Sequence, residues 1–206
     1  MNFGNITFKV ESVDTEVCDD GLGSTDKTIQ YKFLTPWIAL NQINLKRYKA
    51  LTDKDRLILL RRLLSQNIAF VGKEVGLTLE KRIFVDLSLE SLQTNLMDEG
   101  KMGSFDGKFR TNFILPNFIG LGNGITKGYG VLFSQFNPID FSLEELELAN
   151  NQSDDDEPVG ELPEGWEDEA IDPNDIPQSK RLKNSEKGKG TKEPNFNTSK
   201  YHSKTH

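Results

Sequence analysis

The residues of this chain that could do chemistry of their own are concentrated in a glycine-rich stretch, residues 117–130. Five glycines fall within eleven residues there, although glycine loses more chain entropy on ordering than any other residue. Such a backbone can turn through positive φ, and its successive N–H groups then converge into an anion-binding concavity. Lys127 adds a positive charge at the same place. The stretch therefore predicts a loop that holds phosphate groups through Gly120, Gly122, Gly124, Gly128, Gly130 and Lys127.

Two known glycine motifs and one purely structural explanation compete with this interpretation. A dinucleotide-binding fingerprint needs a strand before its glycines and a helix after them, whereas a strand pattern follows here. A Walker loop needs Ser or Thr directly after Gly-Lys, and Gly128 and Tyr129 follow Lys127 instead. The structural alternative is a bulged hairpin whose glycines serve only packing, and the sequence leaves that alternative open.

Three basic residues before the loop, Lys101, Lys108 and Arg110, extend the candidate binding surface. They alternate with apolar positions, so one face of the predicted hairpin is expected to be basic. The aromatic residues between them, Phe105 and Phe109, are interpreted as core residues rather than as platforms for bases. If this surface grips phosphates, its affinity for a polyanion should fall steeply as salt is added.

The elements that must position these residues are short strands and one long helix. Thr52 is a predicted N-cap, and apolar residues at helical spacing over residues 57–71 predict a helix that ends near Gly72 or Gly76. Strands and one helix in this order indicate an α+β domain, an antiparallel sheet with the helix on one face. The strands are predicted over residues 3–17, 28–34, 82–89, 100–116 and 129–133.

Charge divides the 206-residue chain into two parts. Residues 1–135 carry 17 Lys/Arg and 15 Asp/Glu, a net charge of +2, whereas residues 136–206 carry 8 and 17, a net charge of −9. The acidic pI therefore describes the C-terminal part and is no argument against a nucleic-acid partner.

The C-terminal part has too few apolar residues to offset the chain entropy of folding. Its first block, residues 140–175, holds 15 acidic side chains and no basic ones, and its second block, residues 179–206, is basic. We therefore predict a folded domain over residues 1–138 and a disordered tail over residues 139–206.

The expected compartment is the cytoplasm. Cys18 is the single cysteine, which excludes an intrachain disulfide and fits a reducing environment. The N-terminus lacks a basic-then-apolar signal, and no apolar run approaches 18 residues. The sequence therefore predicts a soluble protein without a membrane partner.

The glycine-rich stretch also carries a family resemblance. Glycine–hydrophobic–glycine, five residues that include Lys or Arg, and then glycine–hydrophobic–glycine is the signature of the RAMP superfamily of CRISPR-associated RNA-binding proteins. Residues 120–130 match this signature at every position. Three further segments resemble the C-terminal domain of the CRISPR repeat-processing endoribonucleases: residues 33–42, 64–75 and 103–116. The resemblance covers roughly residues 5–135.

This resemblance implies a ferredoxin-like (RAMP/RRM-like) fold, and it implies CRISPR repeat RNA as the partner of the predicted loop and basic face. It further implies cutting of precursor CRISPR RNA without a metal or other cofactor, through attack of a 2′-hydroxyl on the neighbouring phosphate. Such a reaction needs a base, an acid and positive charge on the phosphorane. A separate chain with the N-terminal domain, or subunits of a CRISPR complex, would be further partners.

Catalytic residues cannot be assigned from this sequence. Related enzymes usually place a catalytic histidine in an N-terminal ferredoxin-like domain, whereas His202 and His206 fall in the predicted tail. Nothing in their spacing sets Tyr31, Tyr48 or Lys127 apart from core aromatics and a surface lysine. Two functions therefore stay open: an RNA-binding, repeat-processing protein or its C-terminal half, and a catalytically inactive structural subunit or truncated fragment.

Overall fold

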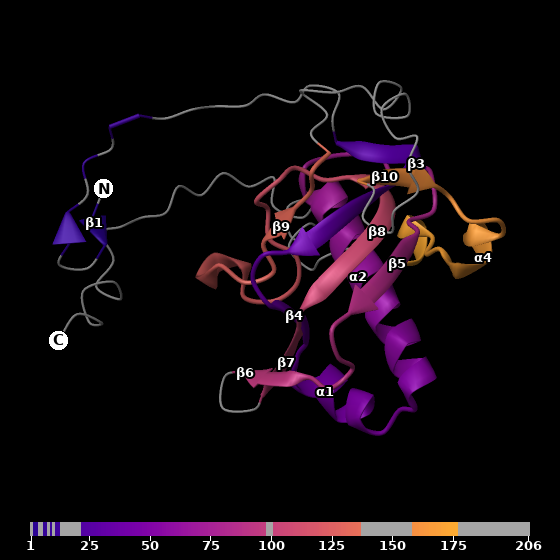
Figure 1. Ribbon diagram of the computed structural model, residues 1–206, viewed down its shortest axis with the longest axis horizontal. Helices are drawn as coiled ribbons and strands as arrows, with labels where there is room; N and C mark the ends of the chain where they lie inside the picture. Colours follow the sequence, from indigo (N-terminus) through magenta and orange to yellow (C-terminus); the bar gives the residue numbers. More distant parts are fainter. Residues whose placement is uncertain are drawn as a thin grey trace, which may run out of the picture. The chain divides into compact units, whose positions relative to one another are not determined.

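The computed structural model describes residues 22–97, 101–136 and 158–176, together with residues 2–3, 6–7, 9 and 11–12. Its main sheet is antiparallel, with the strand order β10–β3–β8–β5 (Figure 1). The short strand β9 pairs with the end of β3 on the edge that β10 also uses, because β8 occupies the other edge. The strands are β3 (Gly23–Phe33), β5 (Val85–Leu89), β8 (Gly107–Ile114), β9 (Leu132–Phe133) and β10 (Val159–Glu161).

A second antiparallel sheet has the order β4–β7–β6, and β4 leads into a short helix, α1. The α+β class with antiparallel sheets is confirmed, whereas this second sheet and α1 were not predicted. Their bounds are β4 (Trp37–Leu40), α1 (Gln42–Lys49), β6 (Asn95–Met97) and β7 (Met102–Phe105). In the region predicted as one strand, residues 3–17, the described pieces form two paired strands, β1 (Asn2–Phe3) and β2 (Ile6–Thr7).

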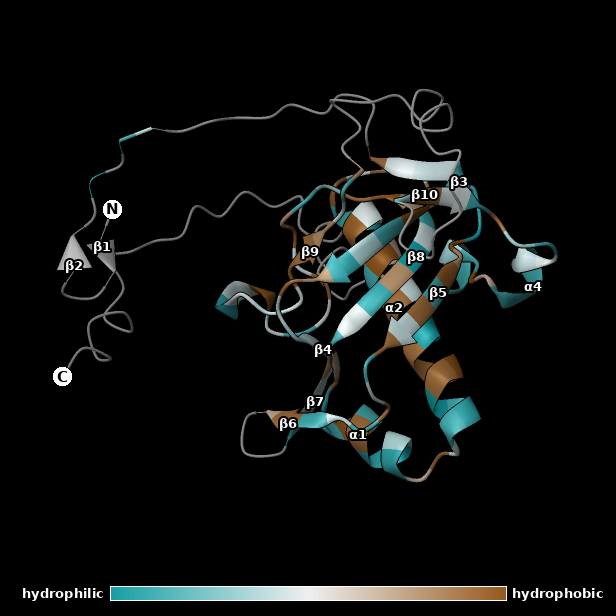
Figure 2. Cartoon of the chain, viewed as in Figure 1, coloured by the Kyte–Doolittle hydropathy of each residue, from teal (hydrophilic) through white to brown (hydrophobic). Residues whose placement is uncertain are grey.

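The long helix α2 (Asp53–Glu74) begins where the sequence predicts, at the N-cap Thr52. The Thr52 hydroxyl accepts a hydrogen bond from the Asp55 amide at 3.3 Å, which satisfies one of the open donors of the first turn. Leu60, Leu64 and Ile68 are fully buried and follow one another at helical spacing along one side of the helix. Figure 2 shows brown, hydrophobic parts of α2 where it passes behind the main sheet. The apolar periodicity of the sequence therefore fixes which side of α2 is covered.

The core between α2 and the main sheet is built from alternate residues of β3 and β8. Tyr31 stacks on Phe109 with ring centroids 5.5 Å apart, and Phe105 and Phe109 are each 1% exposed, as predicted. The Tyr31 hydroxyl donates to the Leu115 carbonyl at 3.2 Å and accepts from the Leu115 amide at 2.8 Å. Burial raises the pKa of Tyr31, so its hydroxyl is a core donor and acceptor rather than an acid or base for a ligand.

Tyr31→Phe is expected to make the stability of the domain less sensitive to alkaline pH. Because the folded state raises the pKa of Tyr31, the stabilisation is complete below the unfolded value of about 10 and is lost as pH rises above it. Above pH 10 the free energy of unfolding of wild type should therefore fall by up to about 1.4 kcal/mol per pH unit through this group. Urea unfolding at pH 8 and pH 11 measures both slopes. The variant should lose about 1–3 kcal/mol at pH 8, where the Leu115 amide lacks its partner, and parallel slopes would contradict the assignment.

The structure corrects the prediction of a disordered tail for residues 158–173. Val159 pairs with Ile29 in the main sheet, and residues up to Pro173 belong to the same compact unit as that sheet. Ile171 exchanges two backbone hydrogen bonds with Ile83, of 2.9 and 3.0 Å. The segment also contains α4 (Trp166–Glu169), and its last residue, Pro173, is the first residue of η2 (Pro173–Asp175).

The prediction from composition was wrong here because three apolar residues of this acidic segment, Val159, Trp166 and Ile171, each contact a residue of the domain. Trp166 packs edge-on against Phe84 with ring centroids 6.4 Å apart, and Val159 is 6% exposed. Two carboxylates pair with basic residues of the domain, Glu161 with Lys27 and Glu169 with Arg61. Residues 139–157 and 177–206 lie outside the described residues.

None of the helices in the described part of the chain combines the length and the apolar character that a membrane span needs.

Candidate nucleic-acid interface

One row of side chains crosses the main sheet on the face that α2 does not cover. Phe133 of β9 lies opposite Lys32 of β3, Lys32 lies opposite Lys108 of β8, and Lys108 lies opposite Ser88 of β5. Directly opposed residues of antiparallel strands point to the same face, with Cβ atoms about 5 Å apart. Four strands from distant parts of the sequence therefore place two lysine residues next to each other on one face, with an aromatic residue at one end.

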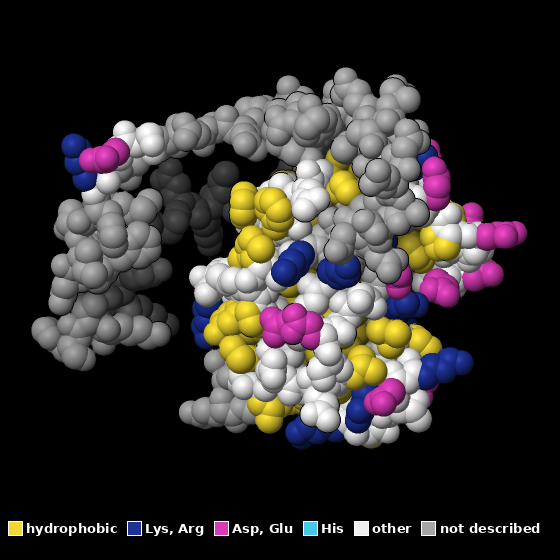
Figure 3. All heavy atoms as spheres, viewed as in Figure 1, with side chains coloured by type: hydrophobic (Ala, Val, Ile, Leu, Met, Phe, Trp, Pro, Cys, Tyr) yellow, Lys and Arg dark blue, Asp and Glu magenta, His cyan; other side chains and the backbone are white. Residues whose placement is uncertain are grey.

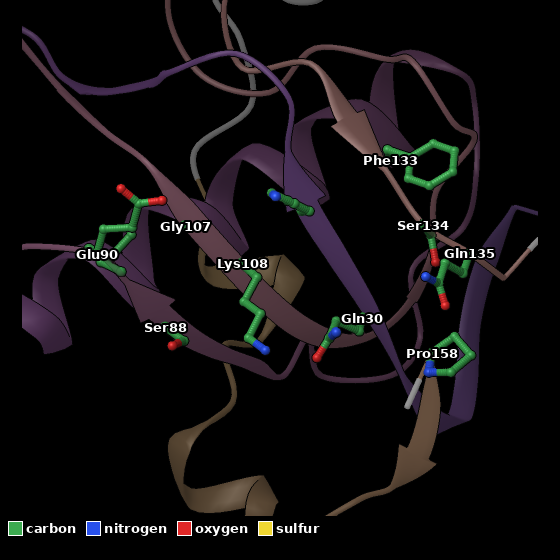
Figure 4. Close-up of a pocket in the computed structure, with 11 residues that line it drawn as sticks. Gln30, Ser88, Glu90, Gly107, Lys108, Phe133, Ser134, Gln135 and Pro158 are labelled. Carbon is green, nitrogen blue, oxygen red and sulfur yellow. The ribbon is translucent and has the colours of Figure 1, made fainter. Parts of the chain in front are cut away.

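A groove of about 560 Å³ follows this row (Figure 4). Phe133, Gln135 and Pro158 line one end, and Glu90 lies at the other end beside Gly107. In the space-filling view, Lys and Arg side chains lie near the middle of this face, next to hydrophobic ones (Figure 3). The remaining lining residues are Gln30, Lys32, Ser88, Leu89, Lys108 and Ser134.

The predicted basic residues lie in two places. Lys108 and Arg110 share the open face of β8, as their alternation indicates, and Arg110 lies opposite Gln30 on β3 and Asp86 on β5. The Arg110 guanidinium also lies close to β10, because a Cβ added at Gly160 would come within 3.0 Å of Nη1. Lys101 is exposed in the turn before β7 and belongs to the second sheet rather than to this face.

Most of the glycine-rich loop is tied into the domain by its own backbone. The Leu121 amide donates to the Gly130 carbonyl at 2.9 Å, and the Gly130 amide donates to the Pro36 carbonyl at 3.0 Å. The Asn123 amide donates to the Ile38 carbonyl of β4, also at 3.0 Å. These amides cannot at the same time bind phosphate, so the candidate phosphate-binding site comprises only part of the glycine-rich stretch.

Packing explains three of the five glycines. A Cβ at Gly130 would lie 2.0 Å from the Leu121 carbonyl oxygen, and one at Gly122 would lie 2.8 Å from the Ile38 carbonyl oxygen. A Cβ at Gly120 would meet Ile125 at 2.9 Å. The structural alternative left open by the sequence therefore accounts for these three positions.

The other two glycines frame an exposed turn. Gly124 and Gly128 both adopt the left-handed conformation, with φ of 74° and 84°, on either side of the short 3₁₀ helix η1 (Ile125–Lys127). No hydrogen bond among the described residues is donated by the amides of Gly124, Ile125 and Thr126. A left-handed residue followed by right-handed ones turns successive amides toward one point, which is the geometry of an anion-binding nest. Lys127 ends the same turn and is exposed.

Sequence reasoning missed the contribution of β3 and β9 to this face. Gln30 and Lys32 alternate with Ile29, Tyr31 and Phe33, so the pattern did contain the outward positions of β3. Nothing in the local sequence shows that Lys32 lies beside Lys108, because that pairing joins residues far apart in the chain. Two further residues of interest, Phe118 and Phe133, are exposed aromatics.

The other candidate residues for chemistry are either buried or not described. Tyr48 is 2% exposed, and its hydroxyl donates to the Leu92 carbonyl at 2.7 Å. Burial raises the pKa of Tyr48, and Asp53 acts in the same direction while Arg56 opposes it. His202, His206 and Cys18 lie outside the described residues.

Comparison with known proteins gives consistent results. Residues 23–135 match the family model of the Cas6b C-terminal domain. An uncharacterized protein of Methanocaldococcus jannaschii is 33% identical over 131 residues, which are 63% of this chain and 88% of that protein.

Solved structures agree with this match. The crystal structure of the CRISPR RNA processing endoribonuclease Cas6b is 35% identical, with a TM-score of 0.51, over 55% of this chain and 57% of that one. A second crystal structure of Cas6b gives the same identity and TM-score over 55% of this chain and 51% of its own. The chain thus spans about half the length of these solved proteins. The match to the family model includes α2, the loop and every strand of the main sheet except β10, and the chain therefore belongs to the family of the Cas6b C-terminal domain.

Proposed function

We propose that this chain binds CRISPR repeat RNA and acts as the C-terminal, RNA-gripping half of a repeat-processing endoribonuclease. The observation that carries the proposal is the pair of opposed lysines, Lys32 and Lys108, on the open sheet face of a Cas6b-type domain. Like charges directly opposite each other destabilise a sheet, and a bound polyanion reverses that effect. The protein is proposed to act in the cytoplasm and to need no metal or other cofactor.

The exposed turn η1 is the second proposed phosphate contact. Its first amides, which follow the left-handed Gly124, donate no hydrogen bond within the described part of the chain, and Lys127 supplies a charge at the end of the turn. The tightly packed glycines, Gly120, Gly122 and Gly130, support this turn rather than touch RNA in this proposal. The contacts to RNA are therefore assigned to the amides of Gly124, Ile125 and Thr126, to Lys127, and to Lys32, Lys108 and Arg110, with Lys101 as an outlying one. The Gly128 amide already donates to the Ile125 carbonyl at 3.0 Å, so Gly128 shapes the turn instead.

The acid and base for cleavage are proposed to come from outside the described domain. Its described residues contain no histidine, and Tyr31 and Tyr48 are buried with their hydroxyls bonded to backbone. Attack of a 2′-hydroxyl needs a base within hydrogen-bond reach of that hydroxyl. A second chain that carries an N-terminal domain is the proposed source.

The full chain is therefore expected to bind repeat RNA in the presence of a chelator and to leave it uncut. Filter binding at 50–200 mM salt gives the affinity, and a denaturing gel of the same samples shows any product. We expect the affinity to fall by roughly 10-fold or more over this range, because several phosphates are neutralised. An affinity that is undetectable even at the lowest salt would refute RNA binding and favour a structural subunit. Cleavage by the chain alone would refute the division of labour.

Lys127→Ala tests the turn by itself. The variant should bind repeat RNA about 3- to 10-fold more weakly at low salt, and its slope of log affinity against log salt should fall by about 0.7. Lys54→Ala is the matched control, because Lys54 is equally exposed but lies in the first turn of α2. A variant that matches wild type at every salt concentration would remove η1 from the interface.

A further inference from the structure

Two exposed phenylalanines stand together beside the groove. Phe118 is 67% exposed and Phe133 is 37% exposed. Their ring centroids are 5.9 Å apart, with the ring planes tilted by 41°. Phe133 lines the groove in the same row as Lys32 and Lys108, so the aromatic pair and the lysines form one continuous surface.

The backbone holds Phe118 in a conformation that this residue type rarely adopts. Phe118 has a φ of 65° and is the one non-glycine residue with positive φ among those described. Glycine or asparagine would fit this position with less strain, and for a bulky residue it is a clear outlier. Strain of this kind points to a use for the side chain itself, because neither the turn nor the core needs an exposed ring here.

A compact set of hydrogen bonds makes the presentation rigid. The Phe118 amide donates to the Leu132 carbonyl at 2.8 Å. The Asn117 side chain accepts from the Ser134 amide at 2.7 Å and donates to the Ser134 carbonyl at 3.1 Å. Each phenylalanine is therefore the chain neighbour of a residue fixed by these hydrogen bonds: Phe118 follows Asn117, and Phe133 precedes Ser134. A platform that is already ordered loses little entropy when a ligand stacks on it.

We infer that the Phe118–Phe133 pair stacks an unpaired nucleobase of the bound RNA, while the phosphates next to that base lie over Lys32 and Lys108. This inference rests on the proposed function. Flat apolar rings beside a cationic row match the two parts of a nucleotide, since aromatic side chains stack bases and ammonium groups attract phosphates. Phe133 and Lys108 are separated by two strand spacings, about 10 Å, and the lysine side chains extend over that distance.

The chemistry of the platform also limits the form of the RNA. Bases inside an A-form duplex are covered by their neighbours, so their faces cannot reach a protein ring, whereas unpaired bases in loops and flanks can. The segment over Phe118 and Phe133 is therefore single-stranded. A protein partner is the competing occupant, but Lys32, Lys108 and Gln135 give the surroundings of the rings a polar and basic character that suits a nucleotide better.

Replacement of the rings is expected to weaken single-stranded RNA binding without a change in its salt dependence. The probes are a single-stranded oligoadenylate and a fully paired, blunt-ended RNA duplex of equal length, measured at 50–200 mM salt with the full chain. Phe118→Asn keeps a residue that tolerates positive φ, and Phe133→Leu keeps an apolar side chain without a flat ring. Each variant should bind the single strand about 10-fold more weakly, with an unchanged salt slope and an unchanged affinity for the duplex. Phe118→Tyr should bind as wild type does, because it keeps the ring.

Each outcome of this experiment has one meaning. Equal loss on both probes, or variants that bind the single strand as well as wild type, would overturn the stacking platform while RNA binding as such survives. A wild type that binds neither probe would instead refute the proposed function. Unchanged RNA affinity together with a loss of self-association in sedimentation would assign the rings to a protein contact. Circular dichroism of each variant confirms that the fold is retained.

Discussion

Gly130→Ala is expected to lower the free energy of unfolding by about 3 kcal/mol or more. The new Cβ would lie 2.0 Å from the carbonyl oxygen of Leu121, and that oxygen is fixed because it belongs to backbone rather than to a mobile side chain. A φ of 69° adds the cost of the left-handed conformation, about 1–2 kcal/mol. Domains of this size are stable by about 5–15 kcal/mol, so the loss is a large share of the total.

Gly128→Ala is the matched control for this substitution. Gly128 also has positive φ, 84°, but a Cβ there meets nothing within 4 Å. We therefore expect this variant to lose only the conformational term, about 1–2 kcal/mol. Urea unfolding of the two variants, followed by circular dichroism, gives the difference directly. Equal losses at the two positions would show that the close approach of Gly130 to Leu121 does not determine stability.

The glycine motif thus combines two physical roles that look alike in the sequence. Its outer glycines let the loop lie against β4 and against itself, at contacts where no side chain fits. Gly124 and Gly128 instead turn the backbone around the exposed η1. The packed glycines also position the exposed turn, because η1 keeps its place only while the segments on both sides are hydrogen-bonded to Pro36 and Ile38.

The parts of the fold that sequence predicts well are those set by local periodicity. The apolar stripe of α2 and the cap at Thr52 lie within one helix, and both are confirmed. The strands over residues 28–34 and 82–89 are confirmed for the same reason, because alternation within a strand shows which residues turn inward. Phe105 and Phe109 were correctly placed in the core on that basis.

What the sequence could not predict depends on which strands become neighbours. The row from Phe133 through Lys32 to Lys108 exists only because β9 and β8 pair with opposite edges of β3. The strand β10 was missed because its three residues are surrounded by acidic ones. It is stabilised by pairing with β3, and its own sequence has no alternation of apolar and polar residues that would predict a strand. Long-range pairing, not composition, decided both cases.

Lys108→Glu is expected to separate RNA binding from folding. The substitution removes one positive charge, adds a negative one and places it opposite Lys32, which then pairs within the sheet. We expect repeat-RNA affinity at low salt to fall by about 100-fold, and the slope of log affinity against log salt to fall by more than 1, because two lysines are lost to phosphate.

The same variant should fold as well as wild type or slightly better. An opposite-charge pair across two strands contributes about 0.2–1 kcal/mol, and it replaces a repulsive lysine pair. Lys32→Glu should behave in the same way, because it creates the same pair from the other strand, and combining the two substitutions should restore repulsion without restoring binding. Urea unfolding and filter binding of the three proteins measure both properties. RNA affinity that survives these changes would show that the lysine row on the open sheet face is not where the phosphates lie.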